Sequence, residues 1–224
     1  FISGAVGLIY EVLWLRMLIL IFGSTQFAVS TILTAFMAGL ALGSWWFGRS
    51  IDRRGDPVAI FGRLELGIGL YGLLVPFLFE ALVPIYRLIW GSFTPDFFAF
   101  SLLRFMLVVI VLIVPTALMG ATLPVLSRFV ARQEESIGLS VGSLYALTTL
   151  GAVLGTSLTG FLLIPGWGTR TTVYIAAGLN LAIGLSALAL SRSKSGSMGS
   201  ASQESQRVRA GGDSGTTSAI PPEA

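Results

Sequence analysis

Six long apolar stretches are the feature that most limits what this chain can fold into. A helix needs about 20 consecutive, mostly apolar residues to cross the hydrocarbon layer of a bilayer. Lipid offers no hydrogen bonds to an exposed backbone, so only helices and closed barrels span it. We therefore predict an all-α integral membrane protein with six transmembrane helices, at residues 2–22, 27–48, 58–80, 99–127, 138–164 and 170–191.

Composition supports a membrane protein and excludes several kinds of chemistry. Of the 224 residues, 54% are hydrophobic and 11% are charged, whereas soluble domains carry about 25% charged residues. The chain has no Cys and no His, so it lacks thiol nucleophiles, imidazole bases and the usual zinc ligands. We expect no metal site, no cofactor and no catalytic residues. The net charge of +3 reflects loop arginines that face an anionic leaflet, and we expect no nucleic-acid partner.

The basic residues predict how the helices are oriented. Cytoplasmic loops of membrane proteins carry an excess of Lys and Arg. The connections after the second and fourth apolar stretches and the tail after the sixth are basic, with Arg49, Arg53, Arg54, Arg128, Arg132, Arg192 and Lys194. These three regions belong on one side of the membrane, so the amino terminus and the tail should both be cytoplasmic.

Residues 192–224 differ in composition from the rest of the chain. They are rich in Ser, Gly, Ala and Gln, and such a segment cannot bury a core of its own. We predict a disordered tail or linker that follows a transmembrane domain formed by residues 1–191. The chain begins at Phe1, without Met and already within an apolar stretch, so we expect a fragment of a longer protein.

Two of the apolar stretches share a glycine pattern. Glycines recur at spacings of four and five residues in both, as Gly39, Gly43 and Gly48 and again as Gly151, Gly155 and Gly160. These stretches are the second members of two successive groups of three, which fits an inverted 3+3 repeat of the kind found in transporters. The alternative is two independent faces of small residues that allow close helix packing.

Glu11 and Arg16 lie within the first apolar stretch, where a charge is costly unless it faces a bundle interior and has a partner. They are five residues apart and cannot pair well on one helix face, so each should find its partner on another helix. One hypothesis is a substrate site in which Glu11 selects a proton or a cationic amine. The other is a structural ion pair, with the arginines extending to the interfaces.

Aromatic residues beside these charges suggest a further contribution to such a site. Tyr10 and Trp14, with Tyr71 from the third stretch, could form an aromatic wall for an amine through cation–π contact. The alternative is ordinary core packing.

A short charged connection predicts a cytoplasmic gate. Asp52 and Arg53 lie between the second and third stretches, and Arg63 and Glu65 follow near the cytoplasmic end of the third. Ion pairs at helix ends can form in one conformation and break in another. The alternative is an ordinary basic cytoplasmic loop.

Several motifs resemble known membrane proteins. The loop that contains Gly48, Asp52, Arg53 and Gly55 resembles the signature loop of the major facilitator superfamily, although Asp56 replaces its usual basic residue. A closer resemblance covers most of residues 1–191 and is to bacterial major-facilitator-like membrane proteins fused to a spermidine-synthase-like domain. Four runs carry it: Ser3–Arg16, Phe36–Ser44, Leu64–Tyr71 and Pro115–Pro124.

This resemblance implies half of a major-facilitator-type bundle in the bacterial inner (plasma) membrane. It implies a membrane module that moves or presents a small polar solute, with a polyamine as the first candidate. Because six helices would enclose half of the usual cavity, transport would need a homodimer or a second six-helix bundle. The alternative is a non-transporting anchor for an aminopropyltransferase domain. Residues 193–224 hold no Gly-rich strand–loop pattern and no acidic cluster, so this chain alone should not transfer an aminopropyl group.

Overall fold

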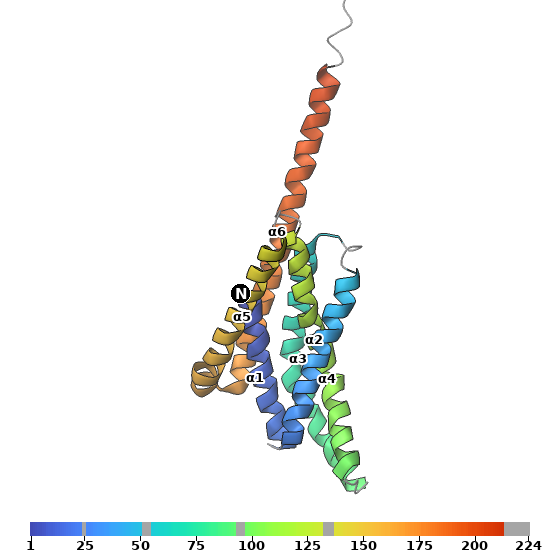
Figure 1. Cartoon of the computed structure of the whole chain (residues 1–224), viewed down its shortest axis with the longest axis vertical. Coiled ribbons are helices and arrows are strands. Elements are labelled where there is room, and N and C mark those ends of the chain that lie inside the picture. Colours follow the sequence, from blue (N-terminus) through green and yellow to red (C-terminus); the bar gives the residue numbers. More distant parts are fainter. Residues whose placement is uncertain (24–25, 51–54, 93–96, 132–136, 213–224) are drawn as a thin grey trace, which may run out of the picture. The chain divides into compact units, whose positions relative to one another are not determined.

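The computed structural model describes residues 1–23, 26–50, 55–92, 97–131 and 137–212, and every regular element in these ranges is helical. The elements, shown in Figure 1, are α1 (Ile2–Phe22), α2 (Gln26–Ser50), α3 (Pro57–Ser92), α4 (Phe97–Ala131), α5 (Ile137–Leu158), the π-helix η2 (Thr159–Leu163) and α6 (Ile164–Gly212). The prediction of an all-helical chain is confirmed for the described residues.

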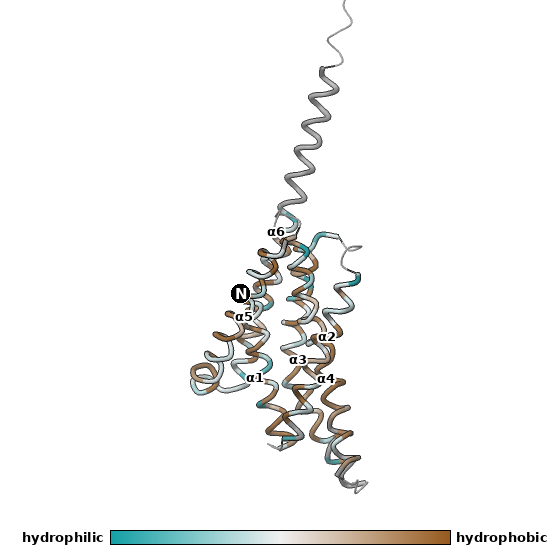
Figure 2. The backbone as a smooth tube through the Cα atoms, viewed as in Figure 1, coloured by the Kyte–Doolittle hydropathy of each residue, from teal (hydrophilic) through white to brown (hydrophobic). Residues whose placement is uncertain are grey.

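Five helical segments are long and apolar enough to cross a bilayer. They are Ile2–Phe22, Val29–Ser50, Pro57–Ile85, Ser101–Ala131 and Gly138–Ser193. Apolar residues follow the length of these helices, whereas hydrophilic residues gather at the end of α2 and the start of α3 (Figure 2). The chain therefore belongs in a lipid bilayer, although five segments meet the criterion where we predicted six.

The difference in number arises within the fifth segment, which has 56 residues. An unbroken helix of that length would measure about 80 Å, against about 30 Å for the hydrocarbon layer. Gly168 interrupts it with φ 77° and ψ 166°, a left-handed conformation that glycine adopts without steric cost. The segment thus contains a backbone break between two apolar helical parts.

The largest group of buried apolar side chains surrounds α1. It takes residues from α1, α2, α3, α4 and the first part of α6, and its largest fully buried members are Tyr10, Leu13, Trp14, Leu18, Phe79 and Leu112. These side chains are less than 2% exposed. α1 therefore contributes much of the buried core, through apolar and aromatic side chains rather than through Glu11 and Arg16.

Small residues bring two pairs of helices into backbone contact. Gly43 of α2 lies against the backbone carbonyl of Ala117 in α4, and Gly155 of α5 lies against that of Ala5 in α1. A Cβ atom at either glycine would collide with the facing carbonyl. Both glycine stretches thus serve close helix packing.

Two prolines lie inside α4, at Pro115 and Pro124. Proline has no backbone N–H, so each frees the carbonyl four residues earlier. The freed Val111 carbonyl accepts a hydrogen bond from the Tyr71 hydroxyl of α3 at 2.7 Å. The freed Gly120 carbonyl accepts one from the Ser44 hydroxyl of α2, also at 2.7 Å. Hydroxyl groups of neighbouring helices therefore compensate for both prolines.

The helix α6 continues to Gly212, through residues for which we predicted a disordered tail. Pro165 and Pro221 bound a long stretch without proline, so no proline ring interrupts a helix there. Residues 213–224 lie outside the described part. Contacts divide the chain into Phe1–Leu188 and Ala189–Ala224, and the features below belong to the first unit.

Candidate functional site

A cavity of about 360 Å³ lies within the first unit and takes lining residues from every α-helix. Each helix contributes at least one polar side chain to it. These polar residues include Ser3 of α1, Ser44 of α2, Glu65 of α3, Thr122 of α4, Thr148 of α5 and Asn180 of α6. The volume falls within the range of small-molecule binding sites.

Glu65 is the acidic residue among the described residues that line this cavity. Its side chain is 0% exposed. The Ser3 hydroxyl donates a hydrogen bond to one carboxylate oxygen, Oε1, at 2.5 Å. The other oxygen, Oε2, is buried and has no hydrogen-bond partner among the described residues. Leaving a buried acceptor unpaired is costly, so Oε2 is a candidate binding atom.

Asn180 supplies a second unpaired acceptor to the same cavity. It is 2% exposed, and its carbonyl oxygen, Oδ1, has no partner within the described part of the chain. The described lining residues include no Lys and no Arg. The cavity therefore offers acceptor oxygens and one carboxylate, which suits a positively charged group and disfavours an anion.

Tyr10 and Trp14 lie behind this cavity rather than in its lining. Their rings stack with centroids 4.9 Å apart, and Trp14 lies 6.4 Å from Phe36, which does line the cavity. The Tyr10 hydroxyl and the Trp14 indole nitrogen are buried without a partner among the described residues. The predicted aromatic residues thus support the cavity wall from the core.

Glu11 and Arg16 are not among the described residues that line the cavity. Glu11 is half-buried and Arg16 is exposed. The structure gives neither side chain an ion pair with another described residue. Glu11 follows the cavity-lining residue Gly7 by four positions, so it lies one turn beyond the cavity on a similar face of α1.

The predicted gate residues are separated. Asp52 and Arg53 lie outside the described residues. Arg63 is exposed and lines a second cavity of about 510 Å³, together with Gly55 and Leu118. Glu65, two residues further along α3, lines the first cavity instead. The structure therefore places these two predicted gate residues in different surroundings.

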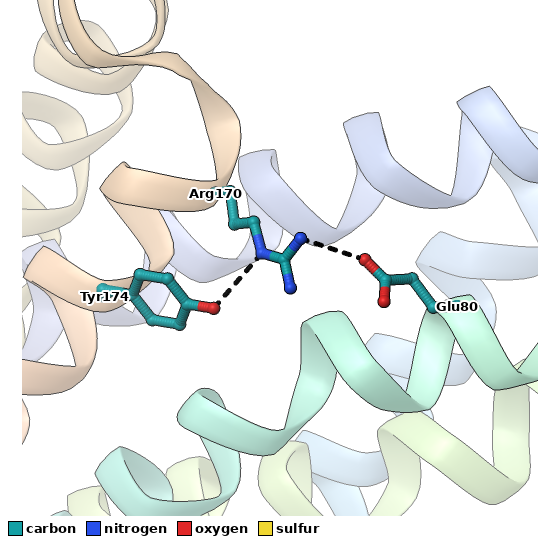
Figure 3. A network of polar contacts seen from close by, with 3 residues as sticks. All are labelled: Glu80, Arg170 and Tyr174. Atoms are coloured by element: carbon teal, nitrogen blue, oxygen red, sulfur yellow. Dashed lines mark hydrogen bonds and ion pairs between the residues drawn. The ribbon is translucent and has the colours of Figure 1, made fainter.

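An exposed ion pair connects α3 to the first turns of α6 (Figure 3). Arg170 lies 3.2 Å from the Glu80 carboxylate, and its Nε donates to the Tyr174 hydroxyl at 3.2 Å. The guanidinium also lies 5.5 Å from the centre of the Phe77 ring. The charged side chains are 54% and 62% exposed, so this network fixes a local geometry more than it adds stability.

Within the described ranges, the structure shows no group of three or more His, Cys, Asp or Glu residues that could hold a metal ion. The candidate site consists of Glu65 and Asn180, which hold the unpaired oxygens, and Ser3, which donates to Glu65. Sequence reasoning had assigned Glu65 to the gate and had not selected Asn180 or Ser3. The sequence feature that could have identified Asn180 is an isolated amide side chain within an apolar stretch, where a polar group needs a hydrogen-bond partner.

Comparison with known proteins gives a distant relative. No family model and no solved structure matches this chain. A polyamine aminopropyltransferase 2 of Streptomyces coelicolor is 29% identical over 185 residues, which are 82% of this chain and 32% of that protein. The chain thus spans about a third of that relative's length. The similarity agrees with the predicted resemblance to spermidine-synthase-like proteins.

Proposed function

We propose that this chain is the membrane module of a transporter-like protein that moves or presents a small cationic solute across the bacterial inner membrane. One observation carries the proposal: a fully buried carboxylate, Glu65, has an unpaired oxygen and lines a cavity built from every α-helix. A passive anchor has no need of such a group, because an unpaired acceptor destabilises the bundle. The name of the distant relative makes a polyamine the first solute to test.

We also propose that the fold is half of a major-facilitator-type bundle with six spans, in which the break at Gly168 separates the fifth span from the sixth. The glycine contacts support an inverted 3+3 repeat. The sequence offset from Gly43 to Gly155 equals the offset from Ala5 to Ala117, and these residues form the two backbone contacts. A repeat relating α1–α3 to α4–α6 would produce both contacts from one arrangement.

In this proposal the basic connections and both termini face the cytoplasm, and Asp52 with Arg53 forms the gate. A homodimer or a second bundle supplies the other half of the transport path. Glu11, one turn beyond the cavity on α1, is a second charge along that path.

A second candidate is a non-transporting anchor for an aminopropyltransferase domain. It is favoured by the relative's name and by the small share of that relative, 32%, that this chain spans. In this case the cavity would be a structural feature, and solute flux would not depend on Glu65.

Flux into proteoliposomes tests both candidates. Labelled methylammonium, putrescine and spermidine are offered separately to vesicles that contain the full chain. Transport predicts uptake of at least one amine above that of protein-free vesicles, and Glu65→Gln should lower its initial rate about tenfold or more. An anchor predicts the protein-free rate for all three. A large loss in Glu11→Gln with no loss in Glu65→Gln would move the solute site to Glu11.

A further inference from the structure

We infer that the Glu65 cavity is a site for a single organic ammonium ion with one positive charge and an apolar body. This inference rests on the proposed function and narrows its small cationic solute to a monocation, because the described lining holds one carboxylate. A polyamine, the first solute to test above, carries several charges and would bind less well.

The first ground for this inference is the charge of the side chains that line the cavity. Glu65 is the one carboxylate among the described lining residues, and no Lys or Arg accompanies it there. Its side chain is 0% exposed, so water screens its charge poorly. A monocation neutralises this carboxylate, whereas a second ammonium group on the same ligand would be buried without a counter-charge, which is costly.

The second ground is that two buried acceptor oxygens in the cavity lack a hydrogen-bond donor. An ammonium group has three donors and no acceptor. Glu65 Oε2 and Asn180 Oδ1 are both buried acceptors that lack a donor within the described residues, and both residues line the same cavity. A protonated amine has enough donors for both acceptors, whereas a neutral hydroxyl has one donor to offer.

The apolar part of the lining distinguishes an organic ion from a metal ion. Leu8, Phe36, Leu40, Ile68, Met119 and Leu123 contribute to the wall. A hard metal cation would gain nothing from these apolar side chains, because its ligands are oxygen atoms. An alkyl chain would instead bury its surface against these side chains at about 25 cal/mol per Å².

Binding to the purified full chain in detergent tests the inference without requiring transport. Isothermal titration is performed with three probes of equal chain length: hexylamine, 1,6-diaminohexane and 1-hexanol. Hexylamine should bind about tenfold or more tightly than either of the others. The diamine would leave one charge uncompensated, and the alcohol would leave the carboxylate uncompensated. Equal affinity for hexylamine and hexanol, or tighter binding of the diamine, would overturn the inference.

Two substitutions change the number of carboxylates in the cavity lining, one by removing the charge of Glu65 and the other by adding a charge at Asn180. Glu65→Gln should remove the preference for hexylamine over hexanol. Asn180→Asp adds a second carboxylate of nearly the same shape and should shift the preference toward 1,6-diaminohexane. Glu80→Gln is the matched control, since it neutralises an exposed carboxylate outside the described cavity lining. If Asn180→Asp misfolds by size-exclusion chromatography, the comparison of the three probes on the native chain still tests the inference.

The binding and flux measurements separate the two proposals. Glu65-dependent binding of hexylamine without any amine flux would support this site and remove the transport function. Amine flux without preference for the monoamine would support transport and overturn the single-charge site.

Discussion

At the scale of single residues, the two carboxylate oxygens of Glu65 have different surroundings. Oε1 accepts a hydrogen bond from the Ser3 hydroxyl at 2.5 Å, whereas Oε2 has no described partner. Ser3 therefore holds one oxygen and leaves the other available to a ligand.

Replacing Ser3 tests this asymmetry. Ser3→Ala leaves both oxygens of a buried carboxyl group without a donor, so the free energy of unfolding should fall by about 1–3 kcal/mol. Thermal unfolding in detergent measures the change. Ser186→Ala is the matched control, because its exposed hydroxyl donates a hydrogen bond to the Ala182 carbonyl of its own helix. Equal losses of unfolding free energy in the two variants would show that the hydrogen bond from Ser3 to Glu65 stabilises the fold no more than an exposed one does.

At the scale of helices, α4 tolerates two internal prolines because other helices supply the missing donors. The Tyr71 hydroxyl compensates for Pro115 through the Val111 carbonyl, and the Ser44 hydroxyl compensates for Pro124 through the Gly120 carbonyl. An unpaired carbonyl in the hydrocarbon region costs several kcal/mol. These hydroxyl bonds therefore connect the proline positions of α4 to α2 and α3.

A double-mutant cycle tests this coupling. Tyr71→Phe alone should lower the free energy of unfolding by about 1–2 kcal/mol, since the Val111 carbonyl loses its donor. In a Pro115→Ala background the restored backbone N–H can satisfy that carbonyl, so the same substitution should cost clearly less. Thermal unfolding of the four proteins gives the interaction free energy. Additive losses would show that the tyrosine does not compensate for the proline.

At the scale of the whole molecule, the number of spans depends on the segment Gly138–Ser193. Its length and the positive φ of Gly168 favour two crossings, and the glycine contacts of α2 with α4 and of α5 with α1 agree with six alternating spans. Whether the number of spans is even or odd decides on which side of the membrane the tail emerges. It therefore also decides whether the tail and the connection that contains Asp56 lie in the same compartment.

Cysteine labelling tests the parity directly, since the chain has no Cys. Asp56→Cys and Ser202→Cys should react with an impermeant maleimide from the same side of the membrane, because an even number of crossings separates them when the fifth segment crosses twice. Ser24→Cys, between α1 and α2 in the sequence, should react from the other side. Labelling of positions 56 and 202 from opposite sides would mean that the fifth segment crosses once.

Much of the helical architecture could be predicted from the sequence alone. Continuous apolar stretches set where the membrane helices lie, because lipid forces the backbone to satisfy its own hydrogen bonds. The glycines that allow close packing and the prolines that interrupt α4 could also be identified, since their effects are local to the backbone. The tail was different: the structure describes a helix as far as Gly212, where composition had indicated disorder.

Only the tertiary structure could distinguish Glu65 from Glu11 as the carboxylate of the cavity. Both residues lie in apolar stretches, and a helix that is apolar on all sides gives no pattern that separates its interior face from its lipid face. Which polar groups meet depends on side chains brought together from distant parts of the chain, such as Ser3, Glu65 and Asn180. The sequence determined that the chain forms membrane helices, and the packing of those helices determined where a binding site can exist.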